Sequence, residues 1–209
     1  GKLKIKLKID KGTQYEVWYD NTQLILPSSI GLHLADGRVI GNGSVKSAKK
    51  RKVNQTIDVF VGKNKELQDA YNELTVSFND SCDLVVRAYD EGVAYHFATR
   101  LNGEITIISE DAIFNFASTP TIYYPECDAN YSGETDQSGR THQVHQGYRN
   151  FERLYKVYKG PLEIPYERFA VSPVLYEYPD SPYKVVVTES NTYDYCLLYT
   201  SDAADDTPC

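Results

Sequence analysis

One carboxylate stands at a position in the sequence from which it could bind a metal ion. Glu189 follows the apolar run VVV at residues 185–187 and one threonine, so it comes at the end of what we expect to be a strong strand. A strand end holds a side chain rigidly, and a hard cation such as calcium takes carboxylate oxygens from several positions. One glutamate cannot make such a site alone. From the residues alone, Glu189 is either an exposed acid at a sheet edge or one ligand of a larger site.

The other patterns that could carry chemistry favour simpler interpretations. His142 and His145 have the spacing H-x-x-H, but Gly139 and Gly147 flank them and no third ligand is evident, so we interpret them as solvated loop histidines. The basic run KKRK at residues 49–52 is interpreted as a solvated loop in an otherwise acidic chain. The sequence has no phosphate-binding glycine-rich loop, no G-x-S-x-G motif and no cysteine pair with zinc spacing. Most of the common enzyme motifs are therefore missing.

The cysteines fall into two groups. Cys82 and Cys127 lie in the part of the chain that is rich in strand-forming residues, whereas Cys196 and Cys209 bracket a small, acidic C-terminal segment. Cys82 and Cys127 could form a disulfide in an oxidising compartment or remain buried thiols. The sequence leaves both states open.

Composition argues against two classes of partner. The 209 residues carry a formal net charge of -7, with a pI near 5.1 and no basic stripe, so we expect no nucleic-acid partner. No apolar run reaches the roughly eighteen residues that span a bilayer, so we expect no membrane partner. Tyrosine is abundant, and it suits both half-buried strand positions and sugar stacking. Methionine is absent, which suggests a segment of a longer reading frame.

Alternation of apolar and polar residues predicts strands along most of the chain. LKIKLKI at residues 3–9 places its apolar residues on one face and three lysines on the other, and YEVWY at residues 15–19 follows a short turn, which predicts a hairpin. Further predicted strands are LILP, GLHL, TIDVFV, ELTVSF, DLVVRAY, VAYHFA, EITII, FNF, TIYY, LYKVY, PVLYEY and YKVVVTE. We therefore expect an all-β fold, a large β-sandwich of a dozen or more mostly antiparallel strands.

Three segments depart from this pattern. GNGSVKSAKKRKVNQ at residues 41–55 and ECDANYSGETDQSGRTHQ at residues 126–143 are predicted to be long loops. A helical period is suggested only by KELQDAYNEL at residues 65–74.

Four phrases of the sequence together resemble a known family. They are GKLKIKLKID, YEVWYDNTQLILPSSIGLHLADG, VVRAYDEGVAYHF and KVVVTESNTYDY. The most specific parts are the pattern R-A-Y-D-x-G-x-A-Y from Arg87 to Tyr95, and the T-E-S phrase at Thr188 with the D-Y pair that ends at Tyr195. Over residues 1–195 the chain resembles the N-terminal domain of glycoside hydrolase family 97.

The resemblance implies a fold, an activity and one site residue. Enzymes of this family have an N-terminal β-super-sandwich, a central (β/α)-barrel with the catalytic acids and a smaller C-terminal β domain. They cleave α-glucosidic or α-galactosidic bonds with inversion or retention. The glutamate of the T-E-S phrase reaches a calcium ion at the active site of the barrel, and carried over to this chain it is Glu189. The resemblance thus implies calcium as cofactor, the barrel of the same chain and an α-linked oligosaccharide as partners, and a periplasmic location.

After Tyr195 the sequence departs from the family pattern. The family continues with Pro-Gly into the barrel, whereas here CLLYTSDAADD begins at Cys196. This string resembles a translated sequencing adapter, because TGT CTC TTA TAC ACA TCT encodes CLLYTS. We expect residues 1–195 to form the sandwich domain and residues 196–209 to be a non-native, disordered tail, with a genuine short linker as the alternative.

Three roles are compatible with the sequence. The first is an accessory domain of an exo-acting α-glycosidase, which has no catalytic residue of its own, is inactive alone, and lines the substrate entrance with the loop from Glu126 to Gln143. The second is a free-standing carbohydrate-binding module that stacks sugar on exposed tyrosines. The third is a structural sandwich without a ligand.

Overall fold

The computed structural model describes residues 2–60, 63–126, 134–135, 141–142, 156–161, 172–179 and 181–190. These residues form the strands β1 to β15 and contain no helix, which confirms the all-β prediction. Within them, accordingly, no helix is long and apolar enough to cross a membrane. The chain divides into two compact units, unit 1 at Gly1–Ala117 and unit 2 at Ser118–Cys209.

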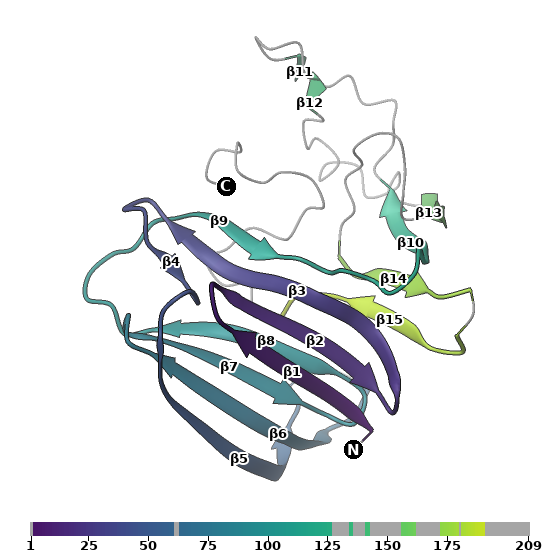
Figure 1. Cartoon of the computed structure of the whole chain (residues 1–209). Coiled ribbons are helices and arrows are strands. Elements are labelled where there is room, and N and C mark those ends of the chain that lie inside the picture. Colours follow the sequence, from purple (N-terminus) through teal and green to yellow (C-terminus); the bar gives the residue numbers. More distant parts are fainter. Residues whose placement is uncertain are drawn as a thin grey trace. The chain divides into compact units, whose positions relative to one another are not determined.

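Unit 1 consists of two antiparallel sheets, which Figure 1 shows as two layers. The first sheet has the order β1 (Leu3–Ile9), β2 (Thr13–Tyr19), β3 (Thr22–Leu34) and β4 (Val39–Ile40), and β9 (Ile107–Ala112) also pairs with β3. The second sheet has the order β5 (Val45–Asp58), β6 (Glu66–Phe78), β7 (Cys82–Ala88) and β8 (Val93–Thr99).

The core of unit 1 lies between these two sheets. Each sheet contributes four buried apolar side chains to one cluster, and the half-buried leucines and isoleucines of β1 pack against it. The eight buried residues are Tyr15, Val17, Ile25 and Ile30 from the first sheet, and Val76, Phe78, Leu84 and Val86 from the second. Two sheets that bury facing apolar sides in this way form a β-sandwich, as predicted.

The passage from the first sheet to the second is fixed at Gly41. This residue follows β4 and has a φ of 89°, a conformation that favours glycine. A Cβ atom placed there would lie 2.9 Å from Cε1 of Phe97, and the hydroxyl of Thr13 donates a hydrogen bond to the carbonyl oxygen of Gly41. The close packing of Phe97 on this turn therefore leaves no room for a side chain.

The sequence pattern of the first hairpin agrees with the structure. In β1, half-buried apolar residues alternate with exposed lysines, and the register pairs Leu3 with Tyr19 and Ile9 with Thr13. The hairpin prediction is confirmed, because the hydrophobic face of β1 fixes which side of the strand meets the core.

Two predictions about the second sheet are wrong. Residues 41–55 do not form a loop, since β5 begins at Val45, and residues 65–74 are not helical, since β6 begins at Glu66. The run KKRK at 49–52 thus lies in a strand. Both misreadings have the same cause: most of β5 and the first half of β6 are exposed on both faces, so these strands lack the alternation of apolar residues that usually marks a strand.

Several predicted strand boundaries also shift. Val59 and Phe60 fall outside β5, so the predicted strand TIDVFV ends at Asp58. The segment FNF at residues 114–116 forms only an isolated bridge, between Ile25 and Phe116. The predicted strand EITII begins later, where β9 starts at Ile107.

Unit 2 contains a sheet with the order β13 (Lys156–Pro161), β10 (Thr121–Glu126), β14 (Val174–Glu177) and β15 (Lys184–Val187). A separate short pair consists of β11 (Glu134–Thr135) and β12 (Thr141–His142). The buried apolar residues of unit 2 include Ile122, Tyr124, Val174, Tyr176 and Tyr178. Burial raises the pKa of Tyr178 to about 12, so this phenol stays neutral at physiological pH.

Candidate functional site

Glu189 lies just beyond the end of an edge strand, as the sequence predicted. Among the residues that the structure describes, β15 pairs only with β14 and forms the margin of its sheet. Glu189 is the second residue after Val187, where β15 ends, and it is partly exposed. The alternation of exposed and half-buried residues in β15 continues through Thr188 and Glu189. By this alternation Glu189 belongs to the half-buried face, with Val185 and Val187, but it lies beyond the last paired residue of the strand.

The beginning of β15 is held by a polar cluster on the neighbouring strands. The hydroxyl of Tyr123 donates a hydrogen bond to Oε2 of Glu177 at 2.5 Å, and the ammonium of Lys184 lies 2.8 Å from Oε1 of the same carboxylate. The hydrogen bond to Glu177 raises the pKa of Lys184. Since Lys184 is also the register partner of Glu177, these contacts stabilise the pairing of β14 with β15.

The described residues near Glu189 do not make a calcium site by themselves. Calcium takes six to eight oxygen ligands. In the part of the chain that the structure describes, no group of three or more histidine, cysteine, aspartate or glutamate side chains could hold a metal ion. A calcium ion bound at Glu189 would therefore need most of its ligands from another part of the protein.

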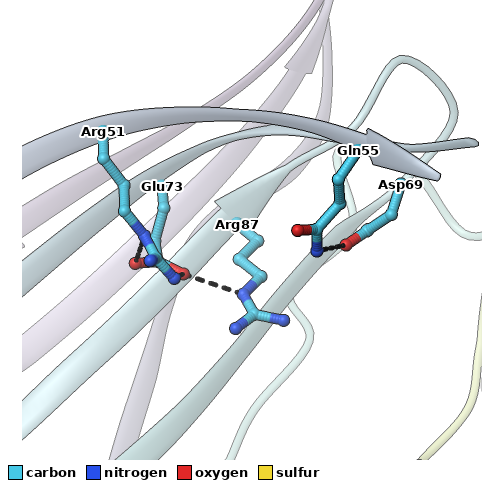
Figure 2. Close-up of polar contacts among 5 residues, drawn as sticks. All are labelled: Arg51, Gln55, Asp69, Glu73 and Arg87. Atoms are coloured by element: carbon cyan, nitrogen blue, oxygen red, sulfur yellow. Dashed lines mark hydrogen bonds and ion pairs between the residues drawn. The ribbon is translucent and has the colours of Figure 1, made fainter. Parts of the chain in front are cut away.

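A second polar arrangement, the Glu73 cluster, consists of Arg51, Glu73 and Arg87 and lies on the second sheet of unit 1. Figure 2 shows both arginines pointing toward the carboxylate of Glu73. Nε and Nη2 of Arg51 donate hydrogen bonds to the two carboxylate oxygens at 2.6 and 3.0 Å, and Nε of Arg87 donates to Oε2 at 2.9 Å. The three residues are cross-strand neighbours, because Arg51 pairs with Glu73 and Glu73 with Arg87.

Aromatic residues support one side of the Glu73 cluster. The guanidinium of Arg87 lies 4.7 Å from the ring centroid of Tyr71, and the ring of Tyr71 packs against Tyr89 at 5.1 Å. This stacking holds Arg87 in place. Arg87 and Tyr89 are also part of the R-A-Y-D-x-G-x-A-Y pattern, so this pattern has a structural role in the sheet.

The electrostatics of the Glu73 cluster indicate a permanent ion pair. Hydrogen bonding to Arg51 lowers the pKa of Glu73, and the contact with Arg87 acts in the same direction. The Glu73 side chain is 5% exposed, although Arg51 itself is 60% exposed. Glu73 is therefore ionised at neutral pH and cannot serve as a general acid there. Sequence analysis missed this cluster, because only the strand register brings the three residues together.

The other predicted candidates have varied outcomes. His142 lies in β12, whereas its proposed partner His145 lies outside the described residues. The loop from Glu126 to Gln143 also falls largely outside them. Cys82 is a buried free thiol, and burial raises its pKa to about 12. For Cys82 the structure thus has the thiol, one of the two states that the sequence left open; Cys127, Cys196 and Cys209 are not among the described residues.

The tyrosines bear on the prediction of sugar stacking. Each tyrosine whose side chain the structure describes is buried or half-buried. Tyr15, Tyr71 and Tyr124 are among the buried ones, with exposures of 6% or less. The described tyrosines thus serve the packing of the sheets.

The chain is similar to a known protein family and to one curated protein over nearly its whole length. The chain matches the family described as Glycosyl-hydrolase 97 N-terminal over residues 1–207. It is 26% identical over 202 residues to a protein of Bacteroides thetaiotaomicron named retaining alpha-galactosidase, and the match covers 96% of this chain and 29% of that protein.

Solved structures show the same fold. A glycoside hydrolase family 97 enzyme from Pseudoalteromonas sp. strain K8, in complex with panose, has a TM-score of 0.72 at 16% identity, covering 95% of this chain and 28% of that one. A beta-arabinopyranosidase has a TM-score of 0.74 at 19% identity, covering 97% and 33%. This chain spans less than a third of the length of the curated relative. Because the family match extends over nearly all of its residues, the chain belongs to the glycosyl-hydrolase 97 N-terminal family.

Proposed function

We propose that this chain is the N-terminal accessory domain of an exo-acting α-glycosidase, an α-galactosidase or α-glucosidase. The observation that carries the proposal is the extent of the matches: they cover 95% or more of this chain but only 28% to 33% of the relatives. A domain of this kind has no catalytic residues of its own, so we expect the 209-residue chain to hydrolyse no glycoside by itself.

We propose an α-linked oligosaccharide as the substrate of the parent enzyme, with α-galactosides as the first to test. The curated relative named retaining alpha-galactosidase is 26% identical to this chain. The enzyme solved with panose is 16% identical. The name of the curated relative is the reason to test the galactoside first, although the sugar would be selected by residues of the catalytic part.

We propose that Glu189 supplies one ligand to a calcium ion that the catalytic barrel also binds. Its location after an edge strand and its partial exposure support this role, because a ligand that reaches another domain must lie outside the core of its own. When bound, calcium would supply positive charge that stabilises the transition state. The part of this chain is to hold the Glu189 carboxylate in place, through the pairing of β14 with β15 that Lys184 and Glu177 reinforce.

The alternative is a free-standing carbohydrate-binding module. Such a module would stack sugar rings on exposed aromatic side chains. The buried or half-buried state of the described tyrosines favours the accessory domain over this alternative. We also propose a periplasmic location, which follows from the family resemblance alone.

The test is a Glu189→Gln substitution in the coding sequence extended beyond codon 195. We expect the extended protein to hydrolyse p-nitrophenyl α-galactoside or α-glucoside and to bind calcium, as measured by calorimetry. Glu189→Gln removes one anionic ligand, so it should weaken calcium binding by about tenfold or more and lower the rate at limiting calcium.

A matched control is Glu104→Gln, because Glu104 is an exposed glutamate in unit 1. This substitution should leave calcium affinity and rate unchanged. Equal calcium affinity in the wild type and in Glu189→Gln would disprove the ligand role. Hydrolysis by the 209-residue chain, or an extended protein without glycosidase activity, would overturn the proposed function itself.

A further inference from the structure

The second sheet of unit 1 bears an open groove of about 700 Å³ over its edge strand. Four segments contribute to it: β5, β6, β7 and the residue after β8. The cationic residues that line it are Lys46, Lys49, Lys50, Arg51 and Arg100, of which Lys50 is the register partner of Leu74 and so reaches the groove from the edge of β5. Its acidic side chains are Glu73 and Asp83. This basic surface, the β5 groove, lies on a chain whose net charge is -7.

The two carboxylates of the β5 groove are already neutralised by arginines. Arg51 pairs with Glu73, and Arg100 pairs with Asp83. Hydrogen bonding to Arg100 lowers the pKa of Asp83, so this carboxylate keeps its arginine at neutral pH.

The three lysines form no such ion pair, although the positive charge of Lys49 also lowers the pKa of Asp83. Lys46, Lys49 and Lys50 are exposed, and none of them forms an ion pair with another described residue. Lysines on an edge strand do discourage pairing with a second strand. Here, however, they stand beside cations and hydroxyls from other segments, which makes a surface with uncompensated positive charge.

The polar groups between the cations narrow the class of ligand. Ser47, Thr75 and Ser77 line the β5 groove, and the register pairs Ser47 with Ser77 and Lys49 with Thr75. Lys49 therefore lies among hydroxyl groups of both strands, which suits a ligand that carries both hydroxyl and anionic groups. Among the described residues no aromatic side chain lines the groove, so a ligand there would be held by charge and hydrogen bonds and not by the ring stacking that single-stranded nucleic acids and many sugars use.

The length of the β5 groove favours an oligomer over a single ion. Lys46 and Lys50, the outer two of the three lysines, are four positions apart on β5, which corresponds to about 13 Å at roughly 3.3 Å per residue. Cations spread over that distance can contact successive anionic groups of one chain.

We propose that the β5 groove binds an anionic glycan, a polysaccharide that carries sulfate or carboxylate groups. Its anionic groups contact Lys46, Lys49 and Lys50, and its hydroxyls contact the serine and threonine side chains of β5 and β6. This binding does not depend on the proposed role of Glu189 as a calcium ligand. It would attach the protein to an acidic polysaccharide independently of the bond that the parent enzyme cleaves.

The test measures binding of the 209-residue chain to heparin, to polygalacturonate and to neutral dextran by calorimetry, at low and at physiological ionic strength. Heparin carries sulfates and polygalacturonate carries carboxylates, so the two distinguish the anionic group. We expect binding to at least one of them, weakening as salt rises, and no binding to dextran. Replacing the three lysines together, by Lys46→Gln, Lys49→Gln and Lys50→Gln, should weaken binding by about tenfold or more.

The matched control replaces Lys4, Lys8 and Lys11 by glutamine. These lysines are also exposed and belong to the first hairpin of unit 1, so the control changes the net charge by the same amount. It should leave the affinity for the glycan within about twofold of wild type. Thermal unfolding of both variants checks that each is folded.

Three results would overturn the proposal. Equal weakening in both triple variants would mean that only net charge matters. The absence of binding to either acidic glycan at low salt would exclude the site. Binding of single-stranded DNA as tight as that of the glycan, and equally sensitive to the three β5 lysines, would replace the glycan with a general polyanion.

Discussion

Glu73 shows how a charged residue can be nearly fully buried outside the hydrophobic core of a sheet. Its neighbours in β6, Leu74 and Val76, are on the core side, so Glu73 points to the opposite face. There the guanidinium groups of Arg51 and Arg87 cover the carboxylate, and hydrogen bonds from both satisfy its oxygens. The burial of Glu73 thus comes from its ion-pair partners. Removing its charge should show how much these ion pairs contribute to the free energy of unfolding.

We predict that Glu73→Gln destabilises unit 1. The glutamine keeps the shape of the side chain but loses the charge that pairs with two arginines. Because Arg51 remains largely solvated, the cost should be modest, about 1–2 kcal/mol in the free energy of unfolding by urea at neutral pH. Glu66→Gln is the control, since Glu66 lies on the same strand and is exposed, and it should change the free energy by less than about 0.5 kcal/mol.

The difference in stability between wild type and Glu73→Gln should depend on pH. Glu73 has a lower pKa in the folded protein than in the unfolded chain, so its contribution is complete above the ordinary glutamate value of 4.5. As the pH falls below that value, toward the lower pKa of the folded state, the contribution is lost. The stability difference between wild type and Glu73→Gln should therefore shrink on acidification. A difference that grows on acidification would show that the ion pair is not the cause.

The position of a single residue in the fold could be predicted only where the neighbouring sequence determines it. Glu189 could be placed after an edge strand because the run VVV marks the strand that precedes it. Arg51, Glu73 and Arg87 could not be grouped, because they are 22 and 14 positions apart and meet only through the register of three strands. Pairings of that kind depend on tertiary structure.

At the scale of elements, the β5–β6 hairpin is longer than the sheet that contains it. β5 and β6 pair from end to end, but β7 pairs only with residues 72–77 of β6. Beyond Tyr71, which packs against Tyr89, the distal part of the hairpin, residues 54–58 and 66–70, thus has only two strands. Its contacts include the hydrogen bond between Gln55 and Asp69, which Figure 2 shows, and the exposed cross-strand pair Ile57 and Leu67.

We predict that this distal part opens locally more often than the rest of the sheet. A two-stranded ribbon without a packed face is marginally stable. Its backbone amides should exchange with deuterium at least about tenfold faster than those of residues 72–77, as measured by peptide-resolved hydrogen exchange. The β1–β2 hairpin is the control. It also consists of two consecutive strands, but its apolar face packs on the core, so its amides should be protected from exchange. Equal protection of the distal and central segments would contradict the prediction.

Whether a strand has one face packed on the core also explains which strands could be predicted from the sequence. β1, β7 and β8 have one face toward the core and show the alternation that reveals a strand. β5 is an edge strand rich in lysine, and the first half of β6 has no core to face, so local composition indicated a loop and a helix instead. Pairing between the two strands, and not burial, makes them strands.

At the scale of the whole molecule, unit 1 contains all that a sandwich requires. Both of its sheets and the cluster between them come from residues 1–117. β9 and the segment after it complete the first sheet: β9 pairs with β3, and Phe114 and Phe116 pack against the core cluster. Sequence analysis predicted a single sandwich over residues 1–195 and did not anticipate this division, because strand patterns continue without a break on both sides of Ala117.

We therefore predict that residues 1–117 fold without unit 2. Trp18, the single tryptophan of the chain, lies in β2, so its fluorescence reports on unit 1. A chain of residues 1–117 should unfold in urea in one cooperative transition, with a slope of about 1–3 kcal/mol per molar urea. A chain of residues 1–99 is the control: it lacks β9 and leaves β3 without that partner, so it should lose the cooperative transition. If residues 1–117 show only a gradual change in fluorescence, unit 1 requires residues beyond Ala117 to form its core.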